Sequence, residues 1–230
     1  MHCFLTDCSP LEDDDLFGRA YSELSEARRE KADRCGSGND RRLSVAAGLF
    51  IRSVERHFGK VGTDENGKPH AEGIEFSLSH SGRYVAFAVS DSPVGVDIER
   101  TGRIAGIAER VMTPSEYDEM IGTVDEDDRE DVLCRMWTAK ESYMKALGTG
   151  FRLPPESFRV LYGYGIRSPD DGMCIQELDA PEGYRLSVCS ADRDIRTVLL
   201  SVHDLIDKDP FGGPLASKDT GPSPNNKKFS

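Results

Sequence analysis

Two carboxylates lie two residues apart in the apolar segment VGVDIER, residues 94–100. If this segment is a strand, its aliphatic side chains face the core and Asp97 and Glu99 share the other face, because alternate residues of a strand point the same way. Two carboxylates at this spacing repel each other unless a cation lies between them, and Mg²⁺ is commonly held by one or two carboxylates with waters and substrate phosphates. The segment therefore predicts either a magnesium site or two solvated acids on an edge strand, paired with Arg83 or Arg100.

A second pair of charges lies in WTAKESYMKALG, residues 137–148. Glu141 and Lys145 are four residues apart, so they share one face of the helix that this segment predicts. They could form an ordinary ion pair worth about 0.3–0.5 kcal/mol, or they could form a working face. The choice depends on whether this face meets the carboxylates of the predicted strand.

A histidine between two serines marks the third segment, FSLSHSGR, residues 76–83. Ser79, Ser81 and the backbone N–H groups of the predicted turn could form a concavity that binds an anion, with His80 beside a phosphate. A turn histidine that is satisfied by its neighbours is the simpler alternative.

The overall charge of the 230-residue chain is −12, which argues against nonspecific binding of nucleic acid. An anionic ligand would need a local cluster of basic residues, and two neighbouring segments supply one. Its members are Arg28, Arg29, Lys31, Arg34, Arg41 and Arg42. The cluster predicts a focused anion site, although solvated helix faces would explain it equally well.

The elements that must position these residues are mixed helices and strands, which predicts an α+β fold. Helices are predicted over 12–34, from Asp40 to Phe58 with Gly59 as the C-terminal cap, over 104–112, from a capping box at Thr113–Glu116, and from 125–131 to Leu147. Strands are predicted on both sides of a tight turn at Ser81-Gly82, over 94–99, and in FRVLYGYG, MCIQEL, YRLSVCS and IRTVLLSV. No G-x-G-x-x-G or Walker-type loop follows a strand, which argues against the nucleotide-binding folds that use them.

Composition sets further expectations about the compartment and the chain end. No apolar run approaches the roughly 20 residues of a membrane span, and the N-terminal residues lack the order of a signal peptide, so a cytoplasmic protein without membrane contact is expected. The six cysteines are expected to be reduced and mainly buried. Residues 207–230 are rich in Gly, Pro, Ser, Asn and Lys, which predicts a disordered tail.

The order and spacing of the three segments resemble the Sfp-type 4'-phosphopantetheinyl transferases. The motifs that carry the resemblance are the S-H-S-G turn, G-V-D-I-E, and W-x-x-K-E-S-x-x-K, with a G-K-P turn at 67–69 and a T-P-S-E-Y helix start at 113–117. The resemblance covers about residues 26–190 and is densest over 76–158. It implies a monomer made of two similar α+β halves, roughly 1–92 and 93–206, with the site at their seam.

The resemblance implies transfer of the phosphopantetheine arm of coenzyme A to a serine of an apo acyl or peptidyl carrier protein. Such carriers serve fatty acid, polyketide or nonribosomal peptide synthesis, and the by-product is adenosine 3',5'-bisphosphate. By matching position, the resemblance implies that Mg²⁺ is held by Asp97, Glu99 and Glu141. It implies that the phosphates of the coenzyme are contacted by Lys145, Ser79 and His80. It implies that the 3'-phosphate is bound by Arg28, Lys31, Arg42 and Ser44, and the adenine by Lys68. Glu141 is also the expected base, with Glu116 as the alternative unless it serves only the capping box. Asn66 stands where a tyrosine often precedes the G-K-P turn.

Two functions of other classes stay open beside the enzyme. The chain could be a non-catalytic module that binds coenzyme A or a carrier protein, or an acidic interaction protein whose motifs are coincidental. Because carrier proteins are acidic like this chain, docking of a carrier is expected to use a local apolar or basic surface near residues 113–131.

Overall fold

The structure is a computed structural model that describes residues 1–104, 106, 108–169 and 172–211. Its longer strands form two sheets, with the order β11-β1-β5-β4 in the first and β6-β10-β9 in the second. The strands of these sheets are β1 (His2–Asp7), β4 (Glu75–Ser81), β5 (Tyr84–Ser90), β6 (Val94–Arg100), β9 (Cys174–Leu178), β10 (Tyr184–Ser190) and β11 (Arg196–Leu199). Short hairpins are formed by β2 (Gly62–Thr63) with β3 (Pro69–His70) and by β7 (Leu161–Tyr162) with β8 (Gly165–Ile166).

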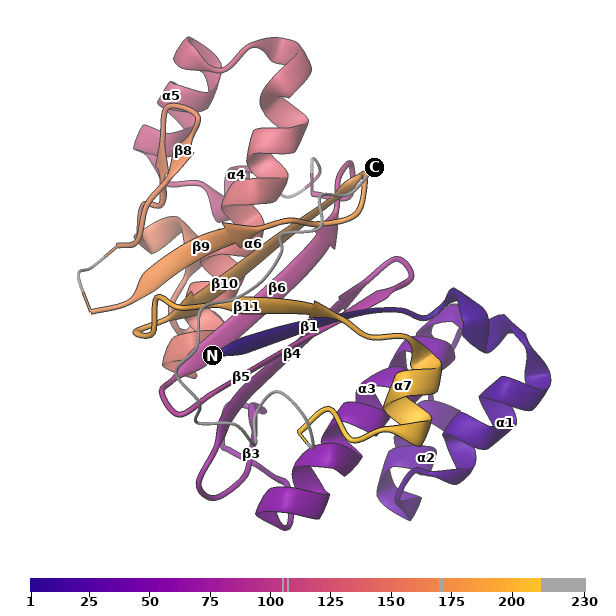
Figure 1. The fold of residues 1–230 in the computed structure, drawn as a ribbon. Coiled ribbons are helices and arrows are strands. Elements are labelled where there is room, and N and C mark those ends of the chain that lie inside the picture. Colours follow the sequence, from indigo (N-terminus) through magenta and orange to yellow (C-terminus); the bar gives the residue numbers. More distant parts are fainter. Residues whose placement is uncertain (105, 107, 170–171, 212–230) are drawn as a thin grey trace.

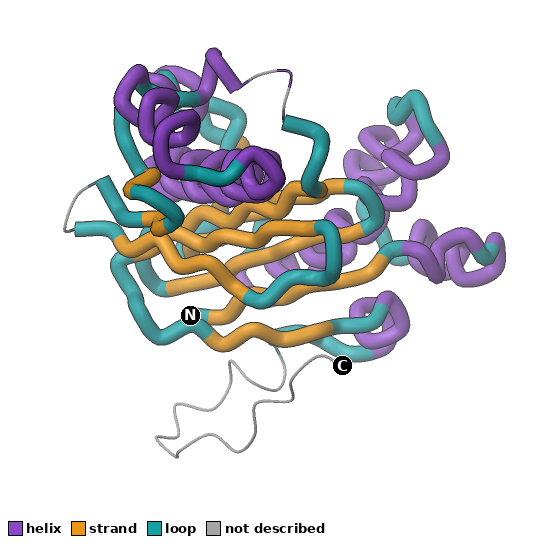
Figure 2. The backbone as a smooth tube through the Cα atoms, turned by 90° about the horizontal axis from the view of Figure 1, so that it is seen from above, coloured by secondary structure: helices purple, strands orange, loops and turns teal. Residues whose placement is uncertain are grey.

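The helices lie on opposite sides of the strands, as Figures 1 and 2 show. The group next to the first sheet comprises α1 (Asp14–Ser22), α2 (Glu26–Asp33), α3 (Gly38–Phe58) and α7 (Val202–Asp207). The group next to the second sheet comprises α4 (Ala108–Val111), α5 (Pro114–Thr123) and α6 (Arg129–Leu147). Single 3-10 turns are η1 (Ser9–Glu12), η3 (Glu126–Asp128), η4 (Gly150–Arg152) and η5 (Pro155–Ser157). Among these helices, none has both the length and the apolar character that crossing a membrane requires.

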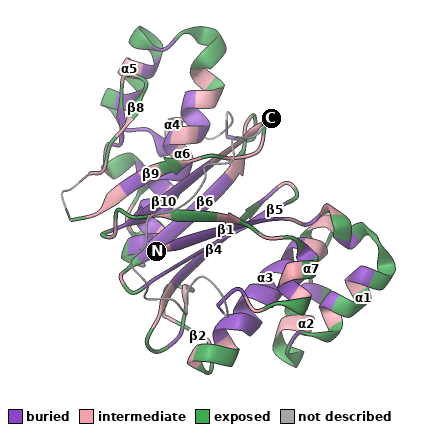
Figure 3. Ribbon diagram, in the orientation of Figure 1, coloured by how far each residue is buried: buried purple, intermediate pink, exposed green. Residues whose placement is uncertain are grey.

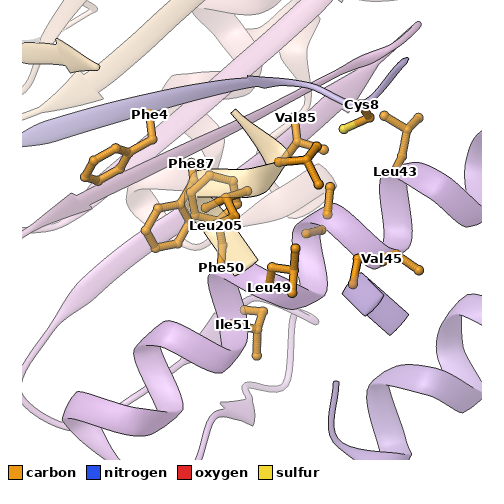
Figure 4. Close-up of a cluster of buried hydrophobic side chains, with 14 of the residues drawn as sticks. Phe4, Cys8, Leu43, Val45, Leu49, Phe50, Ile51, Val85, Phe87 and Leu205 are labelled. Atoms are coloured by element: carbon orange, nitrogen blue, oxygen red, sulfur yellow. The ribbon is translucent and has the colours of Figure 1, made fainter. Parts of the chain in front are cut away.

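Each sheet buries its two faces in different ways. The outer face of the first sheet packs on α3, where the rings of Phe50 and Phe87 stack with centroids 4.8 Å apart (Figure 4). Its inner face joins the second sheet in a cluster of mostly small side chains: Cys3, Leu5, Tyr84, Ala86, Ala88, Val94, Val96, Ile98, Leu186 and Val188. The outer face of the second sheet packs on α6. Strands β1, β5, β6 and β10 are accordingly buried along most of their length, whereas the edge strands β9 and β11 are mainly half-buried or exposed (Figure 3).

The two sheets meet along β4 and β6, which lie side by side. These strands belong to different sheets, and the backbone N–H of Val96 donates instead to the hydroxyl of Ser77 over 3.1 Å. This junction between the sheets, which we call the seam, brings the S-H-S segment next to the carboxylates of β6.

Local rules predicted several elements correctly. The hairpin β4–β5 turns at Gly82, whose φ of 57° suits glycine. Helix α5 begins with the expected capping box between Thr113 and Glu116, and α6 ends at Leu147 with Gly148 in the left-handed conformation. Four of the six cysteines are buried and all six are free thiols, as expected.

Two helix predictions were wrong in detail. The single helix predicted over 12–34 is divided into α1 and α2, and the guanidinium group of Arg29 donates to the carbonyls of Tyr21 and Ser22 at the break. The N-cap of α3 is Ser37, whose hydroxyl accepts from the N–H of Asp40, so the helix starts before the predicted cap. The helix predicted over 104–112 is described only as α4, because residues 105 and 107 lie outside the described residues.

The ends of the chain depart most from expectation. Strand β1 was not predicted. Strand β11 pairs with it in parallel. Residues 196–199 therefore complete the first sheet, although they were expected in the second half. Helix α7 also packs on α1 and α3. The predicted tail begins too early, because Phe211 is buried against Phe58 and Phe87, while residues 212–230 lie outside the described residues. Each sheet carries one long helix, α3 or α6, and any closer similarity of the halves stays a prediction.

Candidate active site

Backbone contact between β6 and α6 gathers the charged residues of two distant segments. A Cβ atom added to Gly95 would lie 1.9 Å from the carbonyl oxygen of Ser142 and 2.4 Å from the backbone nitrogen of Ala146. Only glycine permits this approach, since no side chain separates strand from helix. The contact holds Glu141 and Lys145 against the face of β6 that carries Asp97.

Asp97 is the most deeply buried acid of this group, with 5% of its surface exposed. Its Oδ1 accepts hydrogen bonds from the ammonium of Lys145 (2.6 Å) and from the hydroxyl of Ser79 (2.7 Å). Its Oδ2 is buried and has no hydrogen-bond partner in the described part of the chain. Burial raises the pKa of this carboxyl, and Lys145 and Ser79 oppose the rise. A buried acceptor of this kind is suited to a ligand that brings positive charge or a proton donor.

The charges of both carboxylates of β6 affect the pKa of Glu141. Burial raises the pKa of Glu141 to about 7; Lys145 opposes the rise, and the negative charges of Asp97 and Glu99 add to it. The ammonium of Lys145 lies 3.9 Å from Oε2 of Glu141, so Lys145 lies between this acid and Asp97. The site therefore combines three acids and one ammonium, and one of the acids can exchange a proton near neutral pH.

A metal site is not already formed by these groups. Among the residues that the structure describes, no set of three or more His, Cys, Asp or Glu side chains is close enough together to hold a metal ion. The donor chemistry nevertheless fits a hard cation, because the acids supply oxygen ligands and Oδ2 of Asp97 is free to accept. The roles of Asp97, Glu99 and Glu141 as Mg²⁺ ligands therefore stay predictions. For these three acids to contact one ion, the side chains around Lys145 would have to rearrange.

A pocket of about 570 Å³ lies on the other side of β4. Its lining includes Arg28, Lys31, Ser44 and His80, together with Gly67 and Pro69 of the β2–β3 turn. The alternation of the strand explains the division of S-H-S: Ser79 points to the seam and Asp97, whereas His80 points into the pocket. The pocket and the acids thus share β4 as a common wall.

The basic residues in this pocket have unused hydrogen-bonding groups. Arg28 donates to the carbonyl of Ser44 (3.1 Å), but its Nε and the hydroxyl of Ser44 are buried with no partner among the described residues. Burial lowers the pKa of Arg28, and burial followed by the charge of Arg28 lowers the pKa of Lys31. An anionic ligand would stabilise the charged form of these two buried side chains. Asp40 and Glu55 also line the pocket, so its wall is not uniformly basic.

The histidine of the pocket is expected to be neutral. Desolvation lowers the pKa of His80, and the charge of Lys145 lowers it further, although His80 as a whole residue is exposed. A neutral imidazole can still donate one hydrogen bond to a phosphate.

Two other residues predicted to bind the coenzyme take different positions. Arg42 does not line the pocket, and its guanidinium lies 3.4 Å from the carboxylate of Glu12. The ammonium of Lys68 lies 3.5 Å from the carbonyl of Val94 and 3.6 Å from Glu75 at the edge of the pocket. The side-chain amide of Asn66 donates to the carbonyl of Gly148 over 2.7 Å, which attaches the turn to the end of α6.

Glu116, the alternative base, is fully buried in a network of its own. One oxygen accepts from the ammonium of Lys140 (2.6 Å) and from the N–H of Thr113 (2.8 Å), and the other accepts from the N–H groups of Val160 and Leu161. Burial alone would raise the pKa of Glu116, but Lys140 and the backbone donors outweigh it and lower the pKa. This saturated carboxylate ties α5 to α6, and Glu141 stays our candidate base.

Two residues of the site, Gly95 and Lys140, were missed in the sequence, and Ser81 was considered only as part of a turn that could bind an anion. Ser81 donates a short hydrogen bond to Oε1 of Glu99. The repeated serines at 77, 79 and 81 were a signal, because alternate positions of a strand share one face. Lys140 stood next to Glu141 in the motif but faces the opposite way, toward Glu116.

Comparisons with known proteins give the family. The sequence model of the 4'-phosphopantetheinyl transferase superfamily matches residues 93–189. The 4'-phosphopantetheinyl transferase Sfp of Bacillus subtilis (strain 168) is 33% identical over 193 residues, which cover 76% of this chain and 86% of that protein. The 4'-phosphopantetheinyl transferase gsp of Aneurinibacillus migulanus is 36% identical over 137 residues, covering 55% and 56% of the two chains. The 4'-phosphopantetheinyl transferase HetI of Nostoc sp. is 32% identical over 126 residues, covering 48% and 53%. The chain therefore belongs to the 4'-phosphopantetheinyl transferase superfamily, as an enzyme of the Sfp type.

Proposed function

We propose that the enzyme transfers the 4'-phosphopantetheine group of coenzyme A to a serine of an apo acyl or peptidyl carrier protein and releases adenosine 3',5'-bisphosphate. The observation that supports this most directly is the arrangement around β4. A pocket with cations lies on one face of this strand, and the acids with Lys145 lie on the other. A ligand with a phosphate at one end and a reacting diphosphate at the other fits this arrangement.

The pocket is our candidate for the nucleotide end of coenzyme A. Arg28 and Lys31 supply charge for the 3'-phosphate, and the hydroxyl of Ser44 and Nε of Arg28 supply donors that have no partner in the described residues. His80 supplies a further donor at the wall shared with the acids. The G-K-P turn borders the pocket through Gly67 and Pro69, which favours contact with the adenine there.

Mg²⁺ is the proposed cofactor, with Asp97, Glu99 and Glu141 as the residues that would hold it. When bound, the ion would neutralise charge on the diphosphate of the substrate. Lys145 contributes a point charge from the chain itself, and it is placed to move from Oδ1 of Asp97 to a phosphate oxygen that competes for it.

Proton transfer is the second task of the site. The serine hydroxyl of the carrier must lose its proton as its oxygen bonds to phosphorus and the bond from phosphorus to the nucleotide oxygen breaks. Glu141 is the proposed acceptor of this proton, because it lies beside Lys145 and near the acids of β6. Glu116 is less suited, since its oxygens already accept four hydrogen bonds.

The carrier protein is proposed to dock along α5. Tyr117 and Ile121 are 44% and 48% exposed there, and Tyr117 lines a hollow of about 390 Å³ with Met112, Thr113 and Pro114. An apolar contact would avoid the repulsion expected between an acidic carrier and the acidic residues 125–131. If the contact is apolar, raising the salt concentration should leave the loading rate unchanged or increase it.

We also propose that the enzyme acts as a monomer in the cytoplasm. Its six free thiols agree with a reducing compartment. Gel filtration coupled to light scattering tests the oligomeric state, and a mass of two chains would contradict it.

The deciding experiment incubates the full chain with coenzyme A, Mg²⁺ and a panel of apo carriers, and reads each carrier by intact mass. We expect at least one carrier to gain the mass of phosphopantetheine, and Asp97→Asn to prevent the gain. Binding of coenzyme A by calorimetry without any modified carrier would instead favour a non-catalytic binding module. No binding of coenzyme A would refute the assignment of the pocket.

A further inference from the structure

The seam between β4 and β6 is held by serine hydroxyls in place of a backbone ladder. The hydroxyl of Ser77 accepts from the N–H of Val96, and the hydroxyl of Ser81 accepts from the N–H of Arg100, both over 3.1 Å. The three serines share the inner face of β4, and all are buried. The seam therefore has a hydroxyl at every second position, opposite the strand that carries the acids.

Two of these hydroxyls are committed to carboxylates. A serine hydroxyl has one proton to donate, and Ser81 donates it to Oε1 of Glu99 while Ser79 donates to Oδ1 of Asp97. Ser77 differs, because the hydrogen bond that it makes across the seam is to the backbone of β6. Strand β4 thus presents two serines that hydrogen-bond to acids and one that hydrogen-bonds to the main chain of β6.

The donors on each acid converge on one oxygen. Oε1 of Glu99 accepts from Ser81 and from the N–H of Arg100 (2.9 Å), and its ion pair with Arg103 also involves Oε1. Oδ1 of Asp97 likewise receives both of its hydrogen bonds. In the described part of the chain, the second oxygen of each acid is therefore turned away from these donors. A carboxylate fixed in this way can offer that second oxygen in one direction.

We propose that Ser81 is a positioning residue for Glu99, which it orients so that its free oxygen faces the cation of the active site. The inference rests on the proposed magnesium site and adds a residue to it. Residues that hydrogen-bond to a metal ligand typically change metal affinity by about 10–100-fold when removed. Ser81 hydrogen-bonds to the carboxylate of Glu99 and to the backbone of β6, so its proposed effect passes through Glu99.

Binding of Mn²⁺ to the full chain tests the inference without catalysis. Calorimetry is performed with saturating coenzyme A and no carrier protein. We expect Ser81→Ala to weaken Mn²⁺ binding by about 10-fold or more, with little change in the affinity for coenzyme A measured without metal. The N–H of Arg100 keeps Oε1 of Glu99 as an acceptor in this variant, so the fold should persist, which a thermal melt checks.

Ser77→Ala is the matched control, because it removes a seam hydroxyl that contacts no acid. It should lower the melting temperature and leave Mn²⁺ affinity unchanged. Equal loss of Mn²⁺ affinity in Ser77→Ala and Ser81→Ala would overturn the inference, since seam geometry alone would then explain both. Unchanged affinity in Ser81→Ala, with loss in Asp97→Asn and Glu99→Gln, would overturn the inference and spare the metal site. Unchanged affinity in all four variants would overturn both.

Discussion

Gly95→Ala is the substitution that should separate the two segments of the site. The new Cβ would lie 1.9 Å from the carbonyl oxygen of Ser142, 2.4 Å from the nitrogen of Ala146 and 2.9 Å from Cβ of Lys145. Two of these three atoms belong to the backbone of α6, so rotation of a side chain cannot relieve the overlap. The helix and the strand must move apart by about 1 Å or more to restore ordinary packing distances.

The expected cost has a structural part and a catalytic part. Overpacking a buried contact typically destabilises a protein by about 1–3 kcal/mol, which a 230-residue enzyme can survive. A displacement of about 1 Å at a reacting centre can lower the rate about 100-fold. We therefore expect a folded enzyme whose transfer rate falls by about two orders of magnitude, with affinity for coenzyme A in the pocket changed much less.

The assay is carrier loading followed by intact mass, with thermal unfolding and calorimetric titration of coenzyme A on the same samples. Gly18→Ala is the matched control, because no atom lies within 4 Å of its added Cβ and α1 favours alanine over glycine. Transfer by Gly95→Ala at half the normal rate or more, with an unchanged melting temperature, would refute the argument that this backbone contact positions the site.

Other perturbations address the remaining groups. Glu116→Gln should destabilise the protein by about 3–5 kcal/mol, because it leaves the buried ammonium of Lys140 without its counter-charge. The pKa of Glu116 is lowered in the folded protein, so the stability that its carboxylate contributes is present above about pH 4.5 and is lost on acidification. Urea unfolding at pH 7 and pH 4 tests this, and equal losses at both would contradict it. Glu141→Gln should abolish transfer. Because the pKa of Glu141 is raised to about 7, its carboxyl group favours the folded protein when protonated, and this stability is lost as pH rises from about 4.5 to 7. The uncharged glutamine avoids this loss, so the variant should be more stable than the metal-free parent protein at pH 8 by up to about 3 kcal/mol. Thermal melts at pH 5 and pH 8 check the sign, and the same effect at both values would count against it. Arg28→Met should weaken coenzyme A about 10-fold and 3'-dephospho-coenzyme A little, whereas Arg42→Met should alter neither; calorimetry with both ligands decides, and equal losses for the two ligands would remove Arg28 from the 3'-phosphate.

Features governed by neighbouring residues could be predicted from the sequence. The capping box at Thr113, the end of α6 at Leu147 and the β4–β5 turn depend on interactions within a few residues, and these predictions are confirmed. Strand β1 was missed because it is buried on both faces and so lacks the alternation of polar and apolar residues that marks a half-buried strand. Its partner β11 lies almost 200 residues away, and no local pattern reveals such a pairing.

In the candidate site, too, some residues could be predicted from the sequence and others could not. The motif order gave the acids, Lys145 and the pocket residues Arg28, Lys31 and His80, which the structure brings to the two faces of β4. Arg42 and Ser44 are two residues apart on α3, so their side chains do not face the same way, and Ser44 is the one that lines the pocket.

The contacts that gather the acids were beyond reach from sequence. Ser81 and Gly95 act across the seam and across the contact between strand and helix. The register of β4 against β6, and the distance of α6 from β6, are needed to see what they touch.

The parallel pairing of β1 with β11 has a consequence for synthesis of the chain. During synthesis, β1 must wait for residues 196–199 before one of its edges is covered. The side chain of Phe211, which packs against Phe87, arrives later still. The first sheet therefore completes its folding only after residues 196–211 have been made, and a nascent chain halted before residue 196 would expose a strand edge open to aggregation.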